Sequence, residues 1–317
     1  MDIIISGASK SGKTSIKKVI FEKKYPYQTV FNEPTNKPES LQVESLGYFY
    51  LNITEIPSTF SSKDVNEYDK YLSQSQAFIF VIDTQAPLNA QYDYFKSVIP
   101  VLSKYKSGIS FFVFMHKIDN ANAGQTDYYK TKEEINSKIK QMCADANLGD
   151  LEVNYFATSI YNSSLYEAFS KIFQNILPQN KNLSALIDHL ANTCGLENAF
   201  LFDVFNKISL ASDSSPNSSQ NYEICSDFID LVLDVSGIYC VQKENEEADS
   251  YFDDNSICSI KINSEINNDS KNILFLKFIH KNLALIAIVN EENYERNNLL
   301  EHNINLFKQA VKNILKI

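Results

Sequence analysis

The residues with the clearest chemical meaning form the run GASKSGKT, from Gly7 to Thr14. The run has the spacing G-x-x-x-x-G-K-T and lies between a short apolar strand and a helical pattern, which is the context of a phosphate-binding P-loop. Gly12 and its neighbours let backbone N–H groups curl around phosphates at a helix N-terminus. Lys13 places a charge between the β- and γ-phosphates, and the Thr14 hydroxyl is a ligand for Mg²⁺. A chance turn rich in glycine, serine and lysine explains the context less well. The predicted nucleotide contacts in this loop are Ser9, Lys10, Ser11, Gly12, Lys13, Thr14 and Ser15.

A second motif, HKID, runs from His116 to Asp119 directly after the apolar run 109–115. At the end of a later strand in a P-loop domain, this spacing reads the nucleotide base. The Asp119 carboxylate can accept from both N1–H and the exocyclic amine of guanine, and adenine offers neither donor at those positions. Lys117 would stack its aliphatic stem on the ring, and His116 stands where Asn is more usual. HKID alone could be a surface turn, but together with the P-loop it predicts guanine.

Three weaker signals accompany these motifs. The ATSI run 157–160 ends the next strand, where a backbone amide of Ser159 or Ile160 could bind the guanine carbonyl. Thr35, in the turn-rich NEPTNK segment, could complete the Mg²⁺ shell, although a plain turn threonine fits equally well. Asp83 closes the apolar run AFIFVID and would hold Mg²⁺ in an ATPase. A strand-end cap is the favoured interpretation of Asp83, because HKID follows on the next strand.

The elements that must position these residues alternate between apolar runs and helical patterns across residues 1–178. Strands that are apolar on both faces and alternate with helices predict an α/β domain whose sheet is mixed, mostly parallel and covered on both sides. The predicted strands are 2–6, 48–56, 77–83, 109–115 and 153–157, and the predicted helices are 14–24, 91–104, 132–146 and 165–177.

A polar break at 178–182 predicts a domain boundary, with one domain over 1–178 and a second over 179–317. The second has the order helix, two strands, helix, three strands, helix, which predicts an α+β fold with an antiparallel sheet. Two segments, 212–221 and 243–256, are predicted to be surface loops. The predicted elements are 183–192, 200–205, 207–211, 222–235, 257–262, 272–280, 283–290 and 298–315.

Composition excludes several classes of protein. The chain has 317 residues and a formal net charge of −10, which argues against non-specific binding to nucleic acid or anionic membranes. Five scattered cysteines and four separated histidines predict reduced thiols in a cytosolic protein and no Cys/His metal centre. The apolar runs are far below the roughly 20 residues that span a bilayer. With no signal peptide or lipid-anchor motif expected, membrane association is predicted only through partners.

The motifs taken together resemble the Rag GTPases, specifically their C/D branch. The resemblance runs in order from residue 1 to about 310, through GASKSGKTSIKKVIF, NEPTNK, FIFVID, MHKID, FATSIYNSSLYEAFSKI, ENAFLFDVFNKI and DVSGIY. It implies a Ras-like G domain that binds GTP, GDP and Mg²⁺, followed by a roadblock-type (longin-like) dimerisation domain. It also implies heterodimerisation with a Rag A/B-type subunit, docking on a Ragulator-like scaffold at the lysosome or vacuole, and relay of amino-acid sufficiency to the TOR kinase complex.

The chain departs from this family at one functional segment. The family carries D-x-P-G-Q after its third strand, and here the stretch is Glu55-Ile56-Pro57-Ser58-Thr59. Thr59 stands at the position of the Gln that orients the attacking water, and it is too short for that task. Residues 1–178 contain no arginine, so this domain supplies no arginine finger in cis. Slow or partner-dependent GTP hydrolysis is therefore expected, with no confident catalytic residue. A nucleotide-binding pseudo-GTPase and, less favoured, a P-loop ATPase remain as alternatives.

Overall fold

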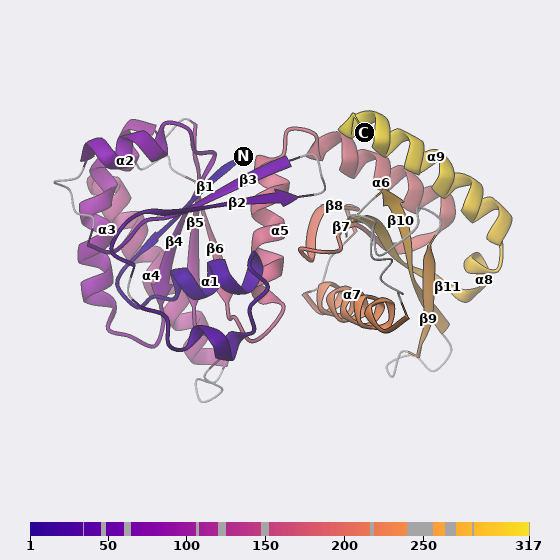
Figure 1. The fold of residues 1–317 in the computed structure, drawn as a ribbon, viewed down its shortest axis with the longest axis horizontal. Coiled ribbons are helices and arrows are strands. Elements are labelled where there is room, and N and C mark those ends of the chain that lie inside the picture. Colours follow the sequence, from indigo (N-terminus) through magenta and orange to yellow (C-terminus); the bar gives the residue numbers. More distant parts are fainter. Residues whose placement is uncertain are drawn as a thin grey trace. The chain divides into compact units, whose positions relative to one another are not determined.

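The fold is seen in a computed structural model that describes residues 1–33, 35–45, 49–59, 65–105, 108–119, 125–146, 152–215, 219–239, 256–263, 271–280 and 282–316. They form two compact units (Figure 1): one contains residues 1–44 and 49–168, and the other begins at Phe169 and includes the C-terminal helix. The division falls inside helix α5 (Ser164–Ile176). The domain boundary expected at residue 178 stays a prediction. Residues 243–255 of the predicted acidic loop and 216–218 of the serine-rich loop lie outside the described residues.

The first unit is built on a six-stranded sheet with the order β2-β3-β1-β4-β5-β6. The four pairings that join β3, β1, β4, β5 and β6 are all parallel, which confirms the mostly parallel sheet. Every side chain of β4 is buried, because the run AFIFVID is apolar on both faces up to its last residue. The strands are β1 (Asp2–Gly7), β2 (Glu39–Ser45), β3 (Phe49–Glu55), β4 (Ala77–Asp83), β5 (Ser110–His116) and β6 (Val153–Thr158).

Helices α2, α3 and α4 pack beside one another, and α3 contacts β1 and β4. The aromatic rings of Phe80 and Phe95 lie 4.7 Å apart in the core between this helical layer and the sheet. Helix α1 packs against β1 and β3. The helices are α1 (Lys13–Ile20), η1 (Pro26–Thr29), α2 (Val65–Leu72), α3 (Leu88–Leu102), η3 (Ser103–Tyr105), α4 (Gln125–Asp145) and α5.

Parallel strands end together at one edge of this sheet, and that edge gathers the predicted functional residues. Gly7 ends β1, Glu55 ends β3, Asp83 ends β4 and His116 ends β5. In open α/β sheets, ligands bind outside these carboxyl ends. The sheet topology therefore brings together motifs that are far apart in the sequence.

The second unit contains a five-stranded sheet with the order β8-β7-β11-β10-β9, and all four of its pairings are antiparallel. This confirms the predicted antiparallel sheet. Figure 1 shows α6 and α9 on one side of the sheet and α7 on the other, where Tyr222 of α7 packs on Phe202 of β7. The elements are α6 (Asn180–Cys194), β7 (Leu196–Asp203), β8 (Ile208–Ser212), α7 (Ser219–Tyr239), β9 (Ile257–Asn263), β10 (Lys271–His280), β11 (Leu283–Asn290), α8 (Glu291–Tyr294) and α9 (Asn297–Leu315).

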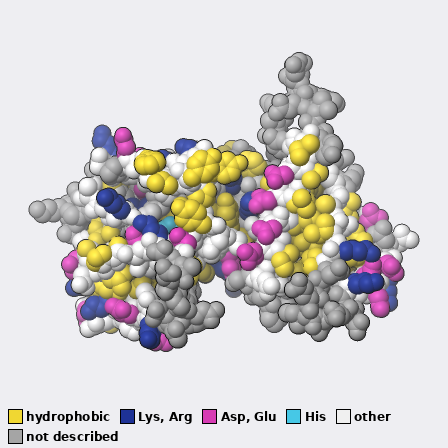
Figure 2. All heavy atoms as spheres, turned by 90° about the horizontal axis from the view of Figure 1, so that it is seen from below, with side chains coloured by type: hydrophobic (Ala, Val, Ile, Leu, Met, Phe, Trp, Pro, Cys, Tyr) yellow, Lys and Arg dark blue, Asp and Glu magenta, His cyan; other side chains and the backbone are white. Residues whose placement is uncertain are grey.

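Helix α7 exposes apolar side chains along one of its faces. Leu231, Val235 and Ile238 follow the spacing i, i+4, i+7, and their exposed fractions are 50%, 46% and 75%. Figure 2 shows a hydrophobic stripe on the second unit with acidic side chains beside it. In the part of the chain that the structure describes, no helix is both long and apolar enough to cross a bilayer.

Candidate functional site

The GASKSGKT run forms a tight loop between β1 and α1, as the sequence predicts. Gly12 has φ of 101°, a backbone conformation that side-chain-bearing residues rarely adopt. A Cβ atom at Gly12 would also lie only 2.6 Å from Cδ2 of His116, which is buried beneath the loop. Both constraints require glycine here. They let the loop backbone pass close over the HKID motif and open onto a cavity of about 570 Å³.

Lys13, the first residue of α1, turns its side chain back over the loop. Its Nζ donates to the carbonyl oxygens of Gly7 and Ala8, both at 2.8 Å. Burial lowers the pKa of Lys13 to about 8, although the Glu55 carboxylate raises it. The ammonium group is thus held at the cavity by two neutral acceptors, and an incoming phosphate would give it a stronger, charged partner.

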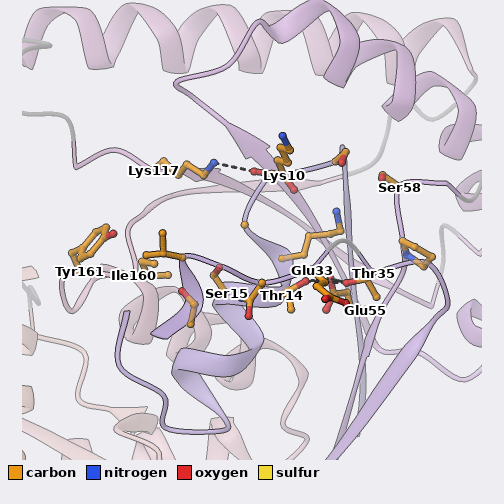
Figure 3. Close-up of a pocket in the computed structure, with 18 residues that line it drawn as sticks. Lys10, Thr14, Ser15, Glu33, Thr35, Glu55, Ser58, Lys117, Ile160 and Tyr161 are labelled. Carbon is orange, nitrogen blue, oxygen red and sulfur yellow. Dashed lines mark hydrogen bonds between the residues drawn. The ribbon is translucent and has the colours of Figure 1, made fainter. Parts of the chain in front are cut away.

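One end of the cavity gathers three side-chain oxygens (Figure 3). The Thr14 hydroxyl donates to Oε1 of Glu55 at 2.5 Å, the Thr35 hydroxyl donates to the same atom at 3.0 Å, and the two hydroxyls lie 3.1 Å apart. Hydroxyl and carboxylate oxygens are the donors that Mg²⁺ prefers. The residues present therefore fit a magnesium ion. Among the described residues, no group of three or more His, Cys, Asp or Glu side chains could hold a metal. A magnesium ion at these oxygens would also take phosphate oxygens and waters as ligands.

Behind this oxygen cluster lies a buried lysine that the sequence analysis did not single out. Nζ of Lys17, in the second turn of α1, is 2.7 Å from Oε2 of Glu39 and 3.0 Å from Oε2 of Glu55. The Lys17 side chain is 4% exposed and that of Glu55 only 1%. Burial lowers the pKa of Lys17, but the two carboxylates outweigh it, and the pKa lies above the ordinary value.

The other end of the cavity is formed by Lys117, Ile160 and Tyr161 (Figure 3). Lys117 has φ of 65°, and its Nζ donates to the Lys10 carbonyl at 2.9 Å and pairs with Oδ2 of Asp83 at 2.6 Å. Asp83 also accepts from the backbone N–H of Gln85 at 2.9 Å, as a strand-end cap does. The strained lysine is thus clamped at the mouth of the phosphate loop.

Two of the predicted base-reading residues are bonded to each other. The Ser159 hydroxyl donates to Oδ1 of Asp119 at 2.8 Å and accepts from the Tyr161 backbone N–H at 3.1 Å. Ser159 is buried, whereas Asp119 is exposed. The serine fixes the direction of the Asp119 carboxylate. Its Oδ2 remains able to accept from donors such as N1–H and the exocyclic amine of guanine.

His116 supports the loop from beneath. It is 1% exposed, and its Nδ1 lies 3.0 Å from the Thr158 hydroxyl. Burial and the neighbouring Lys117 lower its pKa to about 4, although the Asp119 and Asp83 carboxylates raise it. A neutral imidazole here packs against Gly12, and a direct contact with a nucleotide stays a prediction.

The segment that departs from D-x-P-G-Q lies beside the oxygen cluster. Pro57 and Ser58 line the cavity, whereas Thr59 is exposed and is not among the described residues that line it. The Thr59 hydroxyl cannot extend as far from the backbone as the amide of a glutamine at the same position. The structure thus offers no side chain at position 59 that could orient a water in the cavity.

The structure brings most of the predicted residues to one cavity. Ten of them line it: Ser9, Lys10, Ser11, Gly12, Lys13, Thr14, Ser15, Thr35, Lys117 and Ile160. His116, Asp119 and Ser159 are not among the lining residues: His116 and Ser159 are buried, and Asp119 is exposed beside Ser159. Eight further residues line the cavity. Three belong to the 55–59 segment that the sequence had singled out, Glu55, Pro57 and Ser58, and the other five are Thr29, Val30, Asn32, Glu33 and Tyr161. Two kinds of signal were present: Tyr161 directly follows the ATSI run, and Asn32 and Glu33 open the NEPTNK segment. Thr29 and Val30 lie before that segment, in a stretch without a recognisable spacing.

Comparison with known proteins places these observations in a family. The family described as "Gtr1/RagA G protein conserved region" matches residues 2–229. Ras-related GTP-binding protein C from Mus musculus and from Homo sapiens are each 36% identical over 324 residues, which cover 99% of this chain and 77% of the relative. GTP-binding protein gtr2 from Schizosaccharomyces pombe is 34% identical over 318 residues, which cover 98% of this chain and 97% of the relative.

Proposed function

Since the chain belongs to the Gtr1/RagA family of G proteins, we propose that it is a guanine-nucleotide switch subunit of the Rag C/D kind. G proteins of this family bind GTP and GDP and are GTPases. The relatives named C, D and Gtr2 match 98–99% of this chain, whereas those named A, B and Gtr1 match at most 73% of it. The reaction class is hydrolysis of GTP to GDP and phosphate. Two points are specific to this chain: which of its residues bind the nucleotide, and how fast the protein hydrolyses GTP.

One observation carries the proposal: a single cavity has the phosphate-loop residues at one end and Lys117 and Ile160 at the other, next to which Asp119 is bonded to Ser159. Lys13 and the loop backbone hold the phosphates, while Lys117 and Asp119 meet the base. The hydroxyls of Thr14 and Thr35 would hold magnesium beside the β- and γ-phosphates. The bound ion would neutralise phosphate charge.

The same site supports slow hydrolysis. The residues at 58 and 59 lack the bare backbone and the water-positioning amide of the family segment, and residues 1–178 contain no arginine. A second candidate function, a nucleotide-holding subunit that never cycles, is favoured by these same replacements.

The decisive experiment is to identify the nucleotide that co-purifies with the protein, by ion-exchange chromatography of the denatured sample. GDP is expected if the protein cycles, alone or with assistance. GTP alone would favour the subunit that never cycles. ATP would refute both guanine interpretations and would return Asp83 to consideration as a metal ligand.

We further propose that the second unit is a roadblock-type domain that pairs with a Rag A/B-type subunit. The support is the exposed apolar face of α7 formed by Leu231, Val235 and Ile238, together with the position of β8 and β9 as the two outermost strands of the sheet order. Replacing Leu231 and Ile238 by Asp should abolish capture of a co-expressed Rag A/B-type partner. Leu306→Asp on α9, at a similarly exposed leucine, is the matched control and should leave capture intact. Undiminished capture by the double variant would exclude this face.

Family membership also supports a wider proposal, in which the heterodimer docks on a Ragulator-like scaffold and relays amino-acid sufficiency to the TOR complex. The chain would then be cytoplasmic and recruited to the lysosome or vacuole surface through partners. Imaging of the tagged protein, with and without the scaffold, tests this. Recruitment that persists without the scaffold would contradict it.

A further inference from the structure

The buried ion pair between Lys17 and Glu55 lies directly behind the proposed metal-binding oxygens. Glu55 uses its two carboxylate oxygens for different partners: Oε1 accepts from Thr14 and Thr35, and Oε2 meets Lys17 at 3.0 Å. Lys17 continues to Glu39 on β2, at 2.7 Å. The three charged groups thus form a line from the oxygen cluster to the edge strand of the sheet.

The charge of Glu55 requires compensation. A carboxylate that is 1% exposed is costly unless it is paired and hydrogen-bonded. Two hydroxyls supply hydrogen bonds but no charge. Among the described residues, Lys17 is the cation in contact with this carboxylate. The Lys13 ammonium group donates instead to the carbonyl oxygens of Gly7 and Ala8.

Side-chain length makes the pairing functionally relevant. Glutamate is one methylene longer than the aspartate of the D-x-P-G-Q segment, so an unrestrained Glu55 would extend further towards the phosphates. The contact with Lys17 holds one oxygen back towards α1 and leaves the other facing the hydroxyls. A negative charge placed there without a counter-ion would repel a diphosphate or triphosphate.

We propose that Lys17 is a positioning residue for the nucleotide site: it is the built-in counter-ion of Glu55, and it allows the longer carboxylate to stand beside the phosphates when magnesium is absent. The proposal rests on the proposed function, because it assumes that a nucleotide and magnesium bind at this site. It concerns a pair that no motif identified.

The test measures how strongly GDP binding depends on magnesium. The dissociation constant of fluorescently labelled GDP is measured in MgCl₂ and in EDTA, and the ratio of the two values is compared between variants. In Lys17→Met, the charge of Glu55 should repel the GDP phosphates in EDTA, because no cation balances it. In MgCl₂ the magnesium ion should balance that charge. Lys17→Met should therefore raise the EDTA/MgCl₂ ratio about tenfold or more. Lys17→Met/Glu55→Gln should return the ratio to within about threefold of the parent, because both charges are gone.

The controls separate a positioning role from a structural one. Lys24→Met removes another lysine near α1, which pairs with Glu22 at 2.8 Å but is 45% exposed, and it should leave the ratio unchanged. Lys17→Arg should keep the ratio near the parent value. If Lys17→Met weakens GDP binding equally in both buffers, the residue is only structural and the proposal is overturned.

Two further readouts keep the proposal testable if a variant or the nucleotide fails. Should Lys17→Met not fold, Lys17→Gln takes its place, because it removes the charge but keeps a group that can donate to Glu55: the ratio should again rise about tenfold, and an unchanged ratio overturns the proposal. Should the parent not bind GDP in either buffer, the proposed function fails.

The counter-ion role of Lys17 towards Glu55 is then tested by the melting temperatures of the variants. Lys17→Met should lower the Tm of the nucleotide-free protein by about 5–10 °C and the double variant should recover most of it, whereas additive losses would overturn the counter-ion assignment.

Discussion

Two neighbouring regions of the site, the phosphate side and the segment 55–59, differ in how many residues of the family pattern they retain. The phosphate side keeps the glycine, the lysine and the threonine hydroxyl of the P-loop pattern, and Thr35 adds a second hydroxyl. Lys13 donates to a loop carbonyl at 2.8 Å, and the hydroxyls of Thr14 and Thr35 lie 3.1 Å apart. The adjacent segment 55–59 replaces an acid, a glycine and a glutamine of the family pattern. In the proposed function the first region serves binding and the second serves hydrolysis, so the difference predicts that this chain can lose turnover without losing its nucleotide.

The largest expected effect is on hydrolysis. The isolated protein should bind GTP but release phosphate very slowly, since Thr59 positions no water and no arginine neutralises the developing charge. An arginine finger is worth about 10³–10⁵ in rate. Thr59→Gln alone should help little, because Ser58 still crowds the backbone that must approach the γ-phosphate.

The triple variant Glu55→Asp/Ser58→Gly/Thr59→Gln should bring turnover to the level of relatives that carry D-x-P-G-Q. Single-turnover phosphate release distinguishes these outcomes. Fast release by the unmodified protein would mean that a residue outside 55–59 positions the water.

The next largest effect should fall on the binding side. Lys13→Ala removes the buried charge at the loop and should weaken GTP binding about a hundredfold, because a hydrogen bond to a charged group is lost together with its Coulomb attraction. Calorimetry measures the affinity, and the exposed Lys24→Ala provides the comparison. Unchanged GTP affinity in Lys13→Ala would refute the P-loop assignment.

Base recognition offers a sharper test of the nucleotide-binding side of the comparison. Asp119→Asn should weaken GDP binding about 10–100-fold and shift the preference towards xanthosine diphosphate, since a carboxamide can donate to the xanthine oxygen that replaces the guanine amine. Ser159 can still donate to the amide oxygen, so the fold should persist. Competition between GDP and xanthosine diphosphate measures the preference. A variant that still prefers guanine would show that Asp119 does not read the base.

The sequence predicted the elements and motifs that depend on local pattern. Strand β4 could be predicted because all of AFIFVID is suited to a buried strand, and the P-loop because its spacing is specific. Strand β2 was missed: ESLQVES has only Leu41 and Val43 as apolar residues, and both are half-buried at the edge of the sheet. Helix α2 was missed as well.

Contacts across the fold could not be predicted from spacing. Lys17 and Glu39 are separated by 22 residues, and only the pairing of β3 with β1 places Glu55 beside them. A lysine in an amphipathic helix is ordinarily solvated, and nothing local marks this one as buried. The packing of His116 beneath Gly12 is of the same kind, because it depends on β1 and β5 ending at one edge of the sheet.

The smallest predicted effect concerns that histidine, and it tests whether the binding region is rigidly packed. The pKa of His116 is lowered to about 4 by burial and by Lys117, whereas an unfolded histidine titrates near 6.5. The unfolded state therefore binds the extra proton first, and stability should be full above about pH 6.5 and fall as the pH drops towards 4. Between pH 7.5 and 5.5 the free energy of unfolding should fall by about 1.4 kcal/mol, measured by urea unfolding of the nucleotide-free protein.

The His116→Asn variant cannot titrate at this position. Its free energy of unfolding should therefore fall by about 1.4 kcal/mol less than that of the parent over the same pH interval. The other three histidines are present in both proteins and serve as an internal control. Equal pH slopes would mean that His116 takes up its proton in the folded state as readily as in the unfolded state, and that the support beneath Gly12 is loosely packed.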